Sequence, residues 1–113
     1  MHVACIPADG FLQVVVAGKL DAVSAPQFEE KVLPMMKTHG MDTIFNLAEL
    51  SYVSSSGLRV FLQAAKQARE DNTRVALAGL QPMVREVFDL AGFTQFFIVA
   101  TDLESAVHSL KED

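Results

Sequence analysis

Chemistry is suggested first by one short stretch of the sequence, Ser54-Ser55-Ser56-Gly57-Leu58. An apolar run at residues 43–47 precedes it and is typical of a buried strand, and residues 58–65 have the composition and spacing of a helix. The serines therefore lie where we expect a helix to begin. The first backbone N–H groups of a helix lack partners, and the helix dipole is positive there. A serine hydroxyl can cap these groups, and a phosphoserine can do so with more charge.

Two interpretations of the three serines are open at this point. Capping is the simpler one, because serine is a common residue at the start of a helix. Three serines in a row exceed what a cap requires. The remaining hydroxyls would lie at the carboxyl end of a strand, where open α/β sheets place their functional sites. The residues by themselves leave both interpretations open.

Other chemistries fit the sequence less well, and we do not expect an enzyme. A nucleophilic serine needs a base, and the candidates are His2 at the terminus, His39 at a predicted helix end and His108 on the polar side of the last helix. The Gly-x-Ser-x-Gly motif is absent. One cysteine and three scattered histidines show no metal-ligand spacing, and no glycine-rich phosphate loop is present. We therefore expect no metal and no cofactor.

The elements that position the serines alternate along the chain. Apolar runs predict strands at residues 3–6, 11–17, 43–47, 74–78 and 96–99. Helices are predicted from Ser24 to Gly40, at residues 56–71, from Pro82 to Gly92, and after a capping box at residues 101–104. The order β-β-α-β-α-β-α-β-α indicates one α/β domain over residues 1–113, with a mixed, mostly parallel sheet of about five strands and about four helices.

Local signals around the first helix add detail. Ser24 and Gln27 have the spacing of a capping box, and Val23 and Phe28 have that of a hydrophobic staple. Pro34 removes one helical hydrogen bond, so we expect the helix to be kinked or shortened there. The strand at residues 11–17 is apolar nearly throughout, which predicts a central strand covered on both faces.

Composition excludes several classes of partner. Half of the 113 residues are hydrophobic and the net charge is −5, with no basic cluster, which argues against nucleic acid and against an anionic membrane surface. No apolar run approaches the roughly 20 residues of a membrane-spanning helix, and no signal peptide is recognised, so no membrane insertion is expected. Cys5 is the only cysteine, which favours a reducing compartment. We expect a cytoplasmic monomer.

Three motifs resemble the STAS domain family, in its stand-alone form as a bacterial anti-sigma-factor antagonist. They are residues 16–21 after the second strand, the block from Asn46 to Leu58, and residues 91–97. The resemblance covers nearly the whole chain and is most specific in the middle block. It implies that Ser55 is phosphorylated by a kinase that is also the anti-sigma factor, and that a PP2C-type phosphatase removes the phosphate. The unphosphorylated protein would bind the kinase and free the sigma factor.

The resemblance also implies which residues meet the partner. Asp21 matches a family position in a loop close to the acceptor, and the other candidates are Ser54, Ser56, Gly57, Leu58 and Arg59. Ser54 replaces an aspartate that usually precedes the acceptor, and Asn46 replaces one that often ends the third strand. Arg59 stands where a small residue is common. It is either a ligand for a phosphate or an acidic partner, or a solvated helix residue.

A STAS domain that is never phosphorylated is the alternative. It would be a scaffold in a signalling assembly or a structural subunit, for example of a lipid-transport ABC complex. The serine at position 54 favours this alternative, whereas the hydroxyl at Ser55 favours the phosphorylation switch.

Overall fold

An antiparallel hairpin opens the fold. In the computed structural model, which describes residues 1–112, β1 (His2–Ala8) pairs with β2 (Phe11–Leu20) along its whole length. Gly10 has a φ of 88°, which the tight turn between the strands requires and which a glycine adopts readily. Both strands are longer than the apolar runs predict, because backbone pairing extends over polar and small residues as well.

The sheet is mixed and mostly parallel, as predicted. Its order is β1-β2-β3-β5-β6, and all the pairs after the hairpin are parallel, with β3 at Asp42–Asn46, β5 at Val75–Ala78 and β6 at Ile98–Ala100. A sixth strand, β4 (Leu50–Val53), pairs in parallel with the end of β2. The apolar runs of the sequence predict no strand at these residues, and two of the four, Ser51 and Tyr52, are exposed.

Gly18 allows β2 to change its partner. Residues 11–15 of β2 pair with β3, and residues 18–20 pair with β4 after an irregularity between Gly18 and Lys19. Gly18 has a φ of 92°, a conformation that favours glycine. The bulge therefore separates the end of β2 from β3 and leads it beside β4, where the serine stretch begins.

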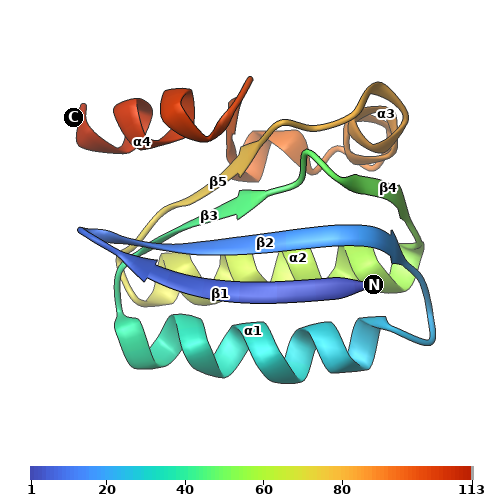
Figure 1. Cartoon of the computed structure of the whole chain (residues 1–113), viewed down its shortest axis with the longest axis horizontal. Coiled ribbons are helices and arrows are strands. Elements are labelled where there is room, and N and C mark those ends of the chain that lie inside the picture. The colour runs from blue at the N-terminus through green and yellow to red at the C-terminus, as the bar shows by residue number, and fades with distance from the viewer. Residues whose placement is uncertain (113) are drawn as a thin grey trace.

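Within residues 1–112, four α-helices and one short 3₁₀ helix complete the fold, and Figure 1 shows how the α-helices are arranged around the sheet. They are α1 (Ala25–His39), α2 (Ser55–Glu70), α3 (Pro82–Leu90), the 3₁₀ helix η1 (Thr94–Phe96) and α4 (Leu103–Lys111). Buried side chains of α1, α2 and α3 share one core cluster with β2, β3 and β5. A smaller cluster joins α4 to Ile44, Ala76 and Ala78 on the other face of the sheet.

Phenylalanine rings form the centre of the larger cluster. Phe61 of α2 lies with its ring centroid 5.0–5.3 Å from those of three other phenylalanines, Phe28, Phe45 and Phe88. Phe88 continues the series to Phe97 at 6.0 Å. Tilted and edge-to-face rings at these separations attract one another beyond the burial of their area. The series fixes α2 against the sheet and so fixes the start of that helix.

Several local predictions are wrong in detail. Ser24 forms no side-chain cap on α1, and Val23 is 84% exposed, so neither the capping box nor the hydrophobic staple exists. Asp102, not Thr101, caps α4, with its carboxylate accepting from the Ser105 N–H at 2.8 Å. At α4 the neighbouring aspartate is the stronger acceptor, and at α1 the Ser24 hydroxyl instead donates to Asp21 Oδ1 at 3.0 Å.

Three larger elements differ in part from their predictions. The helix α1 continues through the exposed Pro34 to His39 and is not shortened. The predicted strand at residues 96–99 is shifted, because Phe96 ends η1 and only Ile98–Ala100 pair with β5. The strand β2 is central, but only its Leu12, Val14 and Val16 face is fully buried, while the opposite face is half-buried.

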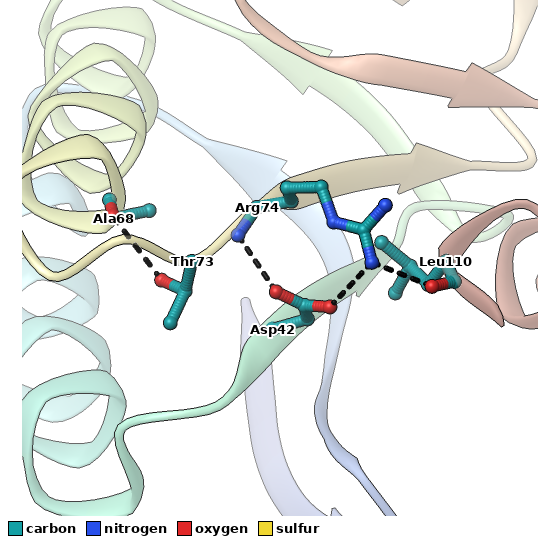
Figure 2. Close-up of polar contacts among 5 residues, drawn as sticks. All are labelled: Asp42, Ala68, Thr73, Arg74 and Leu110. Atoms are coloured by element: carbon teal, nitrogen blue, oxygen red, sulfur yellow. Dashed lines mark hydrogen bonds and ion pairs between the residues drawn. The ribbon is translucent and has the colours of Figure 1, made fainter. Parts of the chain in front are cut away.

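Arg74 ties the start of two strands to the last helix (Figure 2). Its N–H donates to Asp42 Oδ1 at 2.8 Å, and its Nη2 lies 3.2 Å from Asp42 Oδ2. The same Nη2 donates to the carbonyl of Leu110 in the last turn of α4. Thr73, the residue before Arg74, lies just after the end of α2. Its hydroxyl donates to the carbonyl of Ala68, in the last turn of α2, at 3.3 Å.

Candidate functional site

The three serines have three different environments. Ser54 is the N-cap of α2, and its hydroxyl accepts from the Gly57 N–H at 3.2 Å. Ser56 is half-buried, whereas Ser55 is exposed. Ser55 makes no side-chain hydrogen bond within residues 1–112. The cap and the exposed hydroxyl that the sequence left as alternatives therefore both exist, on neighbouring residues.

Backbone contacts fix the first turn of α2 to the sheet. The Ser54 N–H donates to the Leu20 carbonyl at 2.8 Å, which joins the start of the helix to the end of β2. A Cβ atom on Gly57 would lie 2.7 Å from Leu20 Cγ and 3.0 Å from Val53 Cγ2. Since Leu20 and Val53 are themselves buried, only glycine lets the turn approach this closely.

Asp21 lies at the same edge of the sheet. Leu20 of β2 pairs with Val53 of β4, so the residues that follow them, Asp21 and Ser54, leave neighbouring strand ends. Asp21 Oδ1 accepts from the Ser24 N–H, the Ser24 hydroxyl and the Val23 N–H, each at 3.0 Å. The loop between β2 and α1 is thus closed by its own aspartate.

These hydrogen bonds also set the charge of Asp21. The Ser24 backbone N–H, followed by the Ser24 hydroxyl, lowers the pKa of the carboxyl below its ordinary value of 3.8, and the Val23 N–H adds to this. Hydrogen bonds to the charged form are the cause, because they favour the carboxylate over the acid. Asp21 is therefore a fixed negative charge beside the start of α2.

The remaining predicted residues divide into buried and exposed ones. Gly57 and Leu58 are buried, the latter with 7% of its area exposed, so they support the turn from below. Arg59 is exposed on α2, one turn after the cap. The sequence associates six residues around Ser55 with a partner. Of these six, the buried Gly57 and Leu58 offer little surface to a partner.

An exposed apolar side chain at this edge escaped sequence reasoning. Val23 follows Asp21 by two residues and is 84% exposed. The sequence places it as a staple because its spacing to Phe28 fits one, and only the structure shows that its side chain faces solvent. Tyr52 of β4 is also 48% exposed, two residues before the cap. Large apolar groups beside a polar site are typical of protein-binding surfaces.

The three histidines lie in β1, at the end of α1 and in α4. His108 Nε2 is 2.9 Å from Glu112 Oε1 on α4, and within residues 1–112 no histidine hydrogen-bonds a serine. Burial raises the pKa of the Cys5 thiol in β1. The described part of the chain holds no group of three or more His, Cys, Asp and Glu side chains that could bind a metal ion. None of its helices is both long enough and apolar enough to span a membrane.

Comparisons with known proteins agree with this architecture. The family model described as "STAS domain" matches residues 6–108. A protein of Bordetella bronchiseptica named BtrV and described as an anti-sigma factor antagonist is 36% identical over 103 residues, which cover 91% of this chain and 89% of that protein. The anti-sigma-B factor antagonist of Staphylococcus epidermidis is 30% identical over 92 residues, covering 81% of this chain and 85% of that protein.

A solved structure gives the same fold. The Bacillus anti-sigma factor antagonist SpoIIAA in its unphosphorylated form superposes with a TM-score of 0.82 at 22% identity, covering 99% of this chain and 98% of that one. SpoIIAA in its phosphorylated form superposes with a TM-score of 0.74, covering 97% of this chain and all of that one. The likeness at this identity concerns the fold.

Proposed function

The chain belongs to the STAS domain family, and from this premise we propose that it is an anti-sigma-factor antagonist that works by partner switching. Its unphosphorylated form binds an anti-sigma factor that is also a serine kinase. Phosphorylation of Ser55 blocks this binding, and a PP2C-type phosphatase restores it. The observation that carries the proposal is the exposed, unbonded hydroxyl of Ser55 in the first turn of α2, next to a hydroxyl that is used as the cap.

Accessibility singles out Ser55 among the three serines. A kinase has to place the γ-phosphate in line with the attacking hydroxyl, so the hydroxyl must be reachable and free to turn. The Ser54 hydroxyl is engaged with the Gly57 N–H, and Ser56 is half-buried. Phosphorylation at Ser54 would modify the hydroxyl that already serves as the cap, whereas phosphorylation at Ser55 leaves that hydrogen bond unchanged.

The position also explains how one phosphate can act on binding and spare the fold. A phosphoserine adds about −1.5 to −2 charges, and at a helix N-terminus this is favourable by roughly 0.3–1 kcal/mol. In a docked complex the same phosphate would lose its water, and an unpaired buried charge costs about 3–5 kcal/mol. At about 1.4 kcal/mol per tenfold change, the partner would bind at least a hundredfold more weakly.

The surface around Ser55 supports a protein partner. The fixed carboxylate of Asp21, the exposed guanidinium of Arg59 and the exposed apolar side chain of Val23 provide negative, positive and apolar groups. The partner-binding surface thus comprises Asp21, Ser54, Ser56, Gly57, Leu58 and Arg59, in part exposed and in part supporting. Val23 is our addition to that set.

The test begins with the protein purified from its native cells, with phosphopeptides mapped across residues 52–66. We expect phosphate on Ser55. The unphosphorylated protein is then used to capture its kinase, and the dissociation constants of Ser55→Ala and Ser55→Asp are measured by calorimetry. Ser55→Ala should bind as the wild type does, and Ser55→Asp at least about tenfold more weakly.

A matched control keeps the added charge but moves it. Thr101→Asp places an aspartate just before α4, at an exposed position outside the paired ends of β2 and β4. This variant should bind the kinase as the wild type does. Equal affinity of Ser55→Ala and Ser55→Asp would contradict the proposal.

A constitutive scaffold is the second candidate, since Ser54 places a hydroxyl where the family usually carries a carboxylate beside the acceptor. This candidate predicts that no phosphate is found on residues 54–56 under any growth condition. It also predicts that the co-purifying partner is bound equally by Ser55→Ala and Ser55→Asp. The two measurements above therefore decide between the candidates.

A further inference from the structure

A groove of about 760 Å³ lies beside the second half of α2, away from Ser55. One wall is α2 from Leu62 to Arg69, and the other is η1 with the start of β6. At 1.5 Å per residue, Lys66 is about 16 Å along the helix axis from Ser55. The volume lies within the usual range of small-molecule sites, about 300–1,000 Å³.

The short α3 leaves this space open. Its buried residues Val84 and Phe88 belong to the same core cluster as those of α2. However, α3 has nine residues and α2 has 16, and no residue of α3 lines the groove. Phe97, whose ring lies 6.0 Å from that of Phe88, belongs both to this core cluster and to the lining of the groove.

The base of the groove is apolar. Val75 of β5 is 4% exposed and Phe97 is 9% exposed, while Ala65 and Leu62 are half-buried on the helix side. Phe96 of η1 is 46% exposed at the opposite wall. A phenyl ring and small aliphatic side chains can hold the flat or linear apolar body of a ligand.

The rim of the groove carries positive charge without negative charge. Three of the 13 lining residues are cationic, and none of the 13 is an aspartate or a glutamate, although the chain as a whole has a net charge of −5. Arg74 is engaged with Asp42 and the Leu110 carbonyl. Lys66 and Arg69 are exposed, and neither forms an ion pair within residues 1–112. The amide of Asn72 is a further hydrogen-bond donor in the lining, whereas Gln95 Nε2 already donates to the Gly92 carbonyl at 2.9 Å.

From this combination we infer that the groove binds a small anion with an apolar body, such as an aryl or acyl phosphate, sulfonate or carboxylate. The apolar part lies on Val75, Phe97 and Phe96, and the acidic group meets Lys66 and Arg69. These two cations are three residues apart on α2 and face the same side, so an anion between them also removes their mutual repulsion. This inference concerns a second site and does not depend on the proposal for Ser55.

The test uses 1-naphthyl phosphate as the probe and the amide ¹H–¹⁵N spectrum of the full chain as the readout. We expect saturable shifts at residues 62–75 and 95–98, with a Kd of about 1 mM or tighter. Uncharged 1-naphthol and inorganic phosphate, which each lack one half of the probe, should bind at least about tenfold more weakly. Shifts confined to residues 54–58 would place the anion on the helix N-terminus and overturn the inference.

Variants separate the two halves of the site. Lys66→Gln and Arg69→Gln should each weaken binding of the probe about tenfold, because a hydrogen bond to a charged group is lost. Lys19→Gln removes the same charge from the exposed end of β2 and should change nothing. Ala65→Leu keeps a good helix former and fills the groove, so it should abolish the shifts without loss of the folded spectrum.

Provided that these variants are folded, either of two results would overturn the inference. Unchanged affinity in Lys66→Gln and Arg69→Gln would mean that the cations do not hold the anion. Binding of an acidic peptide, with no binding of 1-naphthyl phosphate, would make the groove a protein-docking surface instead.

Discussion

Adjacent serine residues differ in their structural roles within residues 1–112 of this chain. Ser54 gives its hydroxyl to the Gly57 N–H and so completes the start of α2, while Ser55 keeps an exposed hydroxyl one residue later. This division follows from backbone geometry. Ser54 has extended dihedral angles, with φ −87° and ψ 172°, which direct its side chain back toward the helix N-terminus.

The division can be tested by stability alone. We expect Ser54→Ala to lower the free energy of unfolding by about 1 kcal/mol, because the cap is lost, and Ser55→Ala to change it by less than about 0.5 kcal/mol. Ser54→Asp restores an acceptor and adds a negative charge at the positive end of the helix. It should equal the wild type or exceed it by roughly 0.3–1 kcal/mol.

Urea unfolding followed by circular dichroism measures these differences. A loss in Ser55→Ala as large as that in Ser54→Ala would show that the two hydroxyls share the capping role.

At the scale of the elements, α1 accommodates Pro34, a residue type that usually interrupts a helix. Pro34 cannot donate to the carbonyl of Glu30, yet the helix runs on to His39. Both Pro34 and Glu30 are exposed, so water can take the place of the missing N–H. Buried Phe28, Val32 and Met36 on the opposite side hold the helix to the sheet and outweigh the local cost.

Replacing this proline should therefore stabilise the protein. Pro34→Ala restores the hydrogen bond and is expected to raise the free energy of unfolding by roughly 1–2 kcal/mol, after allowance for the greater freedom of the unfolded chain.

Pro26→Ala is the matched control, because Pro26 lies in the first turn of the same helix, where no N–H is needed. It should be neutral or slightly destabilising. Equal stabilisation by both changes would point to the unfolded state as the cause.

For the molecule as a whole, two loop aspartates make the free energy of unfolding depend on pH. The pKa of Asp21 is lowered by hydrogen bonds from Ser24 and Val23, and the pKa of Asp102 is lowered by hydrogen bonds from Ser105. Because each carboxyl has a lower pKa in the folded chain than in the unfolded chain, the unfolded chain takes up protons first as the pH falls. Their contribution is full above the ordinary carboxyl range and is lost as the pH falls through the lowered pKa.

We therefore expect the free energy of unfolding to decrease as the pH falls below about 5, and to decrease less steeply in Asp21→Asn. In Ser24→Ala the pKa of Asp21, followed by NMR of its side-chain carboxyl, should move up toward 3.8 because the hydroxyl donor is removed, while the backbone N–H donor of residue 24 remains. An unchanged Asp21 titration in Ser24→Ala would show that the Ser24 hydroxyl does not contribute to the lowered pKa of Asp21.

Local patterns in the sequence determined most of the fold. Apolar runs gave β2, β3 and β5, helical spacing gave all four α-helices, and their alternation gave the mostly parallel sheet. The membership in the STAS family, read from residues 16–21, the block from Asn46 to Leu58 and residues 91–97, is confirmed. Periodicity and motif depend on neighbouring residues only, which is why sequence suffices for them.

The tertiary structure alone decided features that depend on contacts between distant segments. β4 is a strand because the bulged end of β2 pairs with it, and its own four residues carry too little pattern to show this. Which of the three serines caps α2 depends on the hydrogen bond from Ser54 to Leu20. Val23 faces solvent because Asp21 closes its loop, and the cationic groove is formed by α2 together with η1 and the start of β6, which lie far apart in the chain. Hydrogen bonds and steric exclusion between segments far apart in the chain are fixed only when the chain has folded.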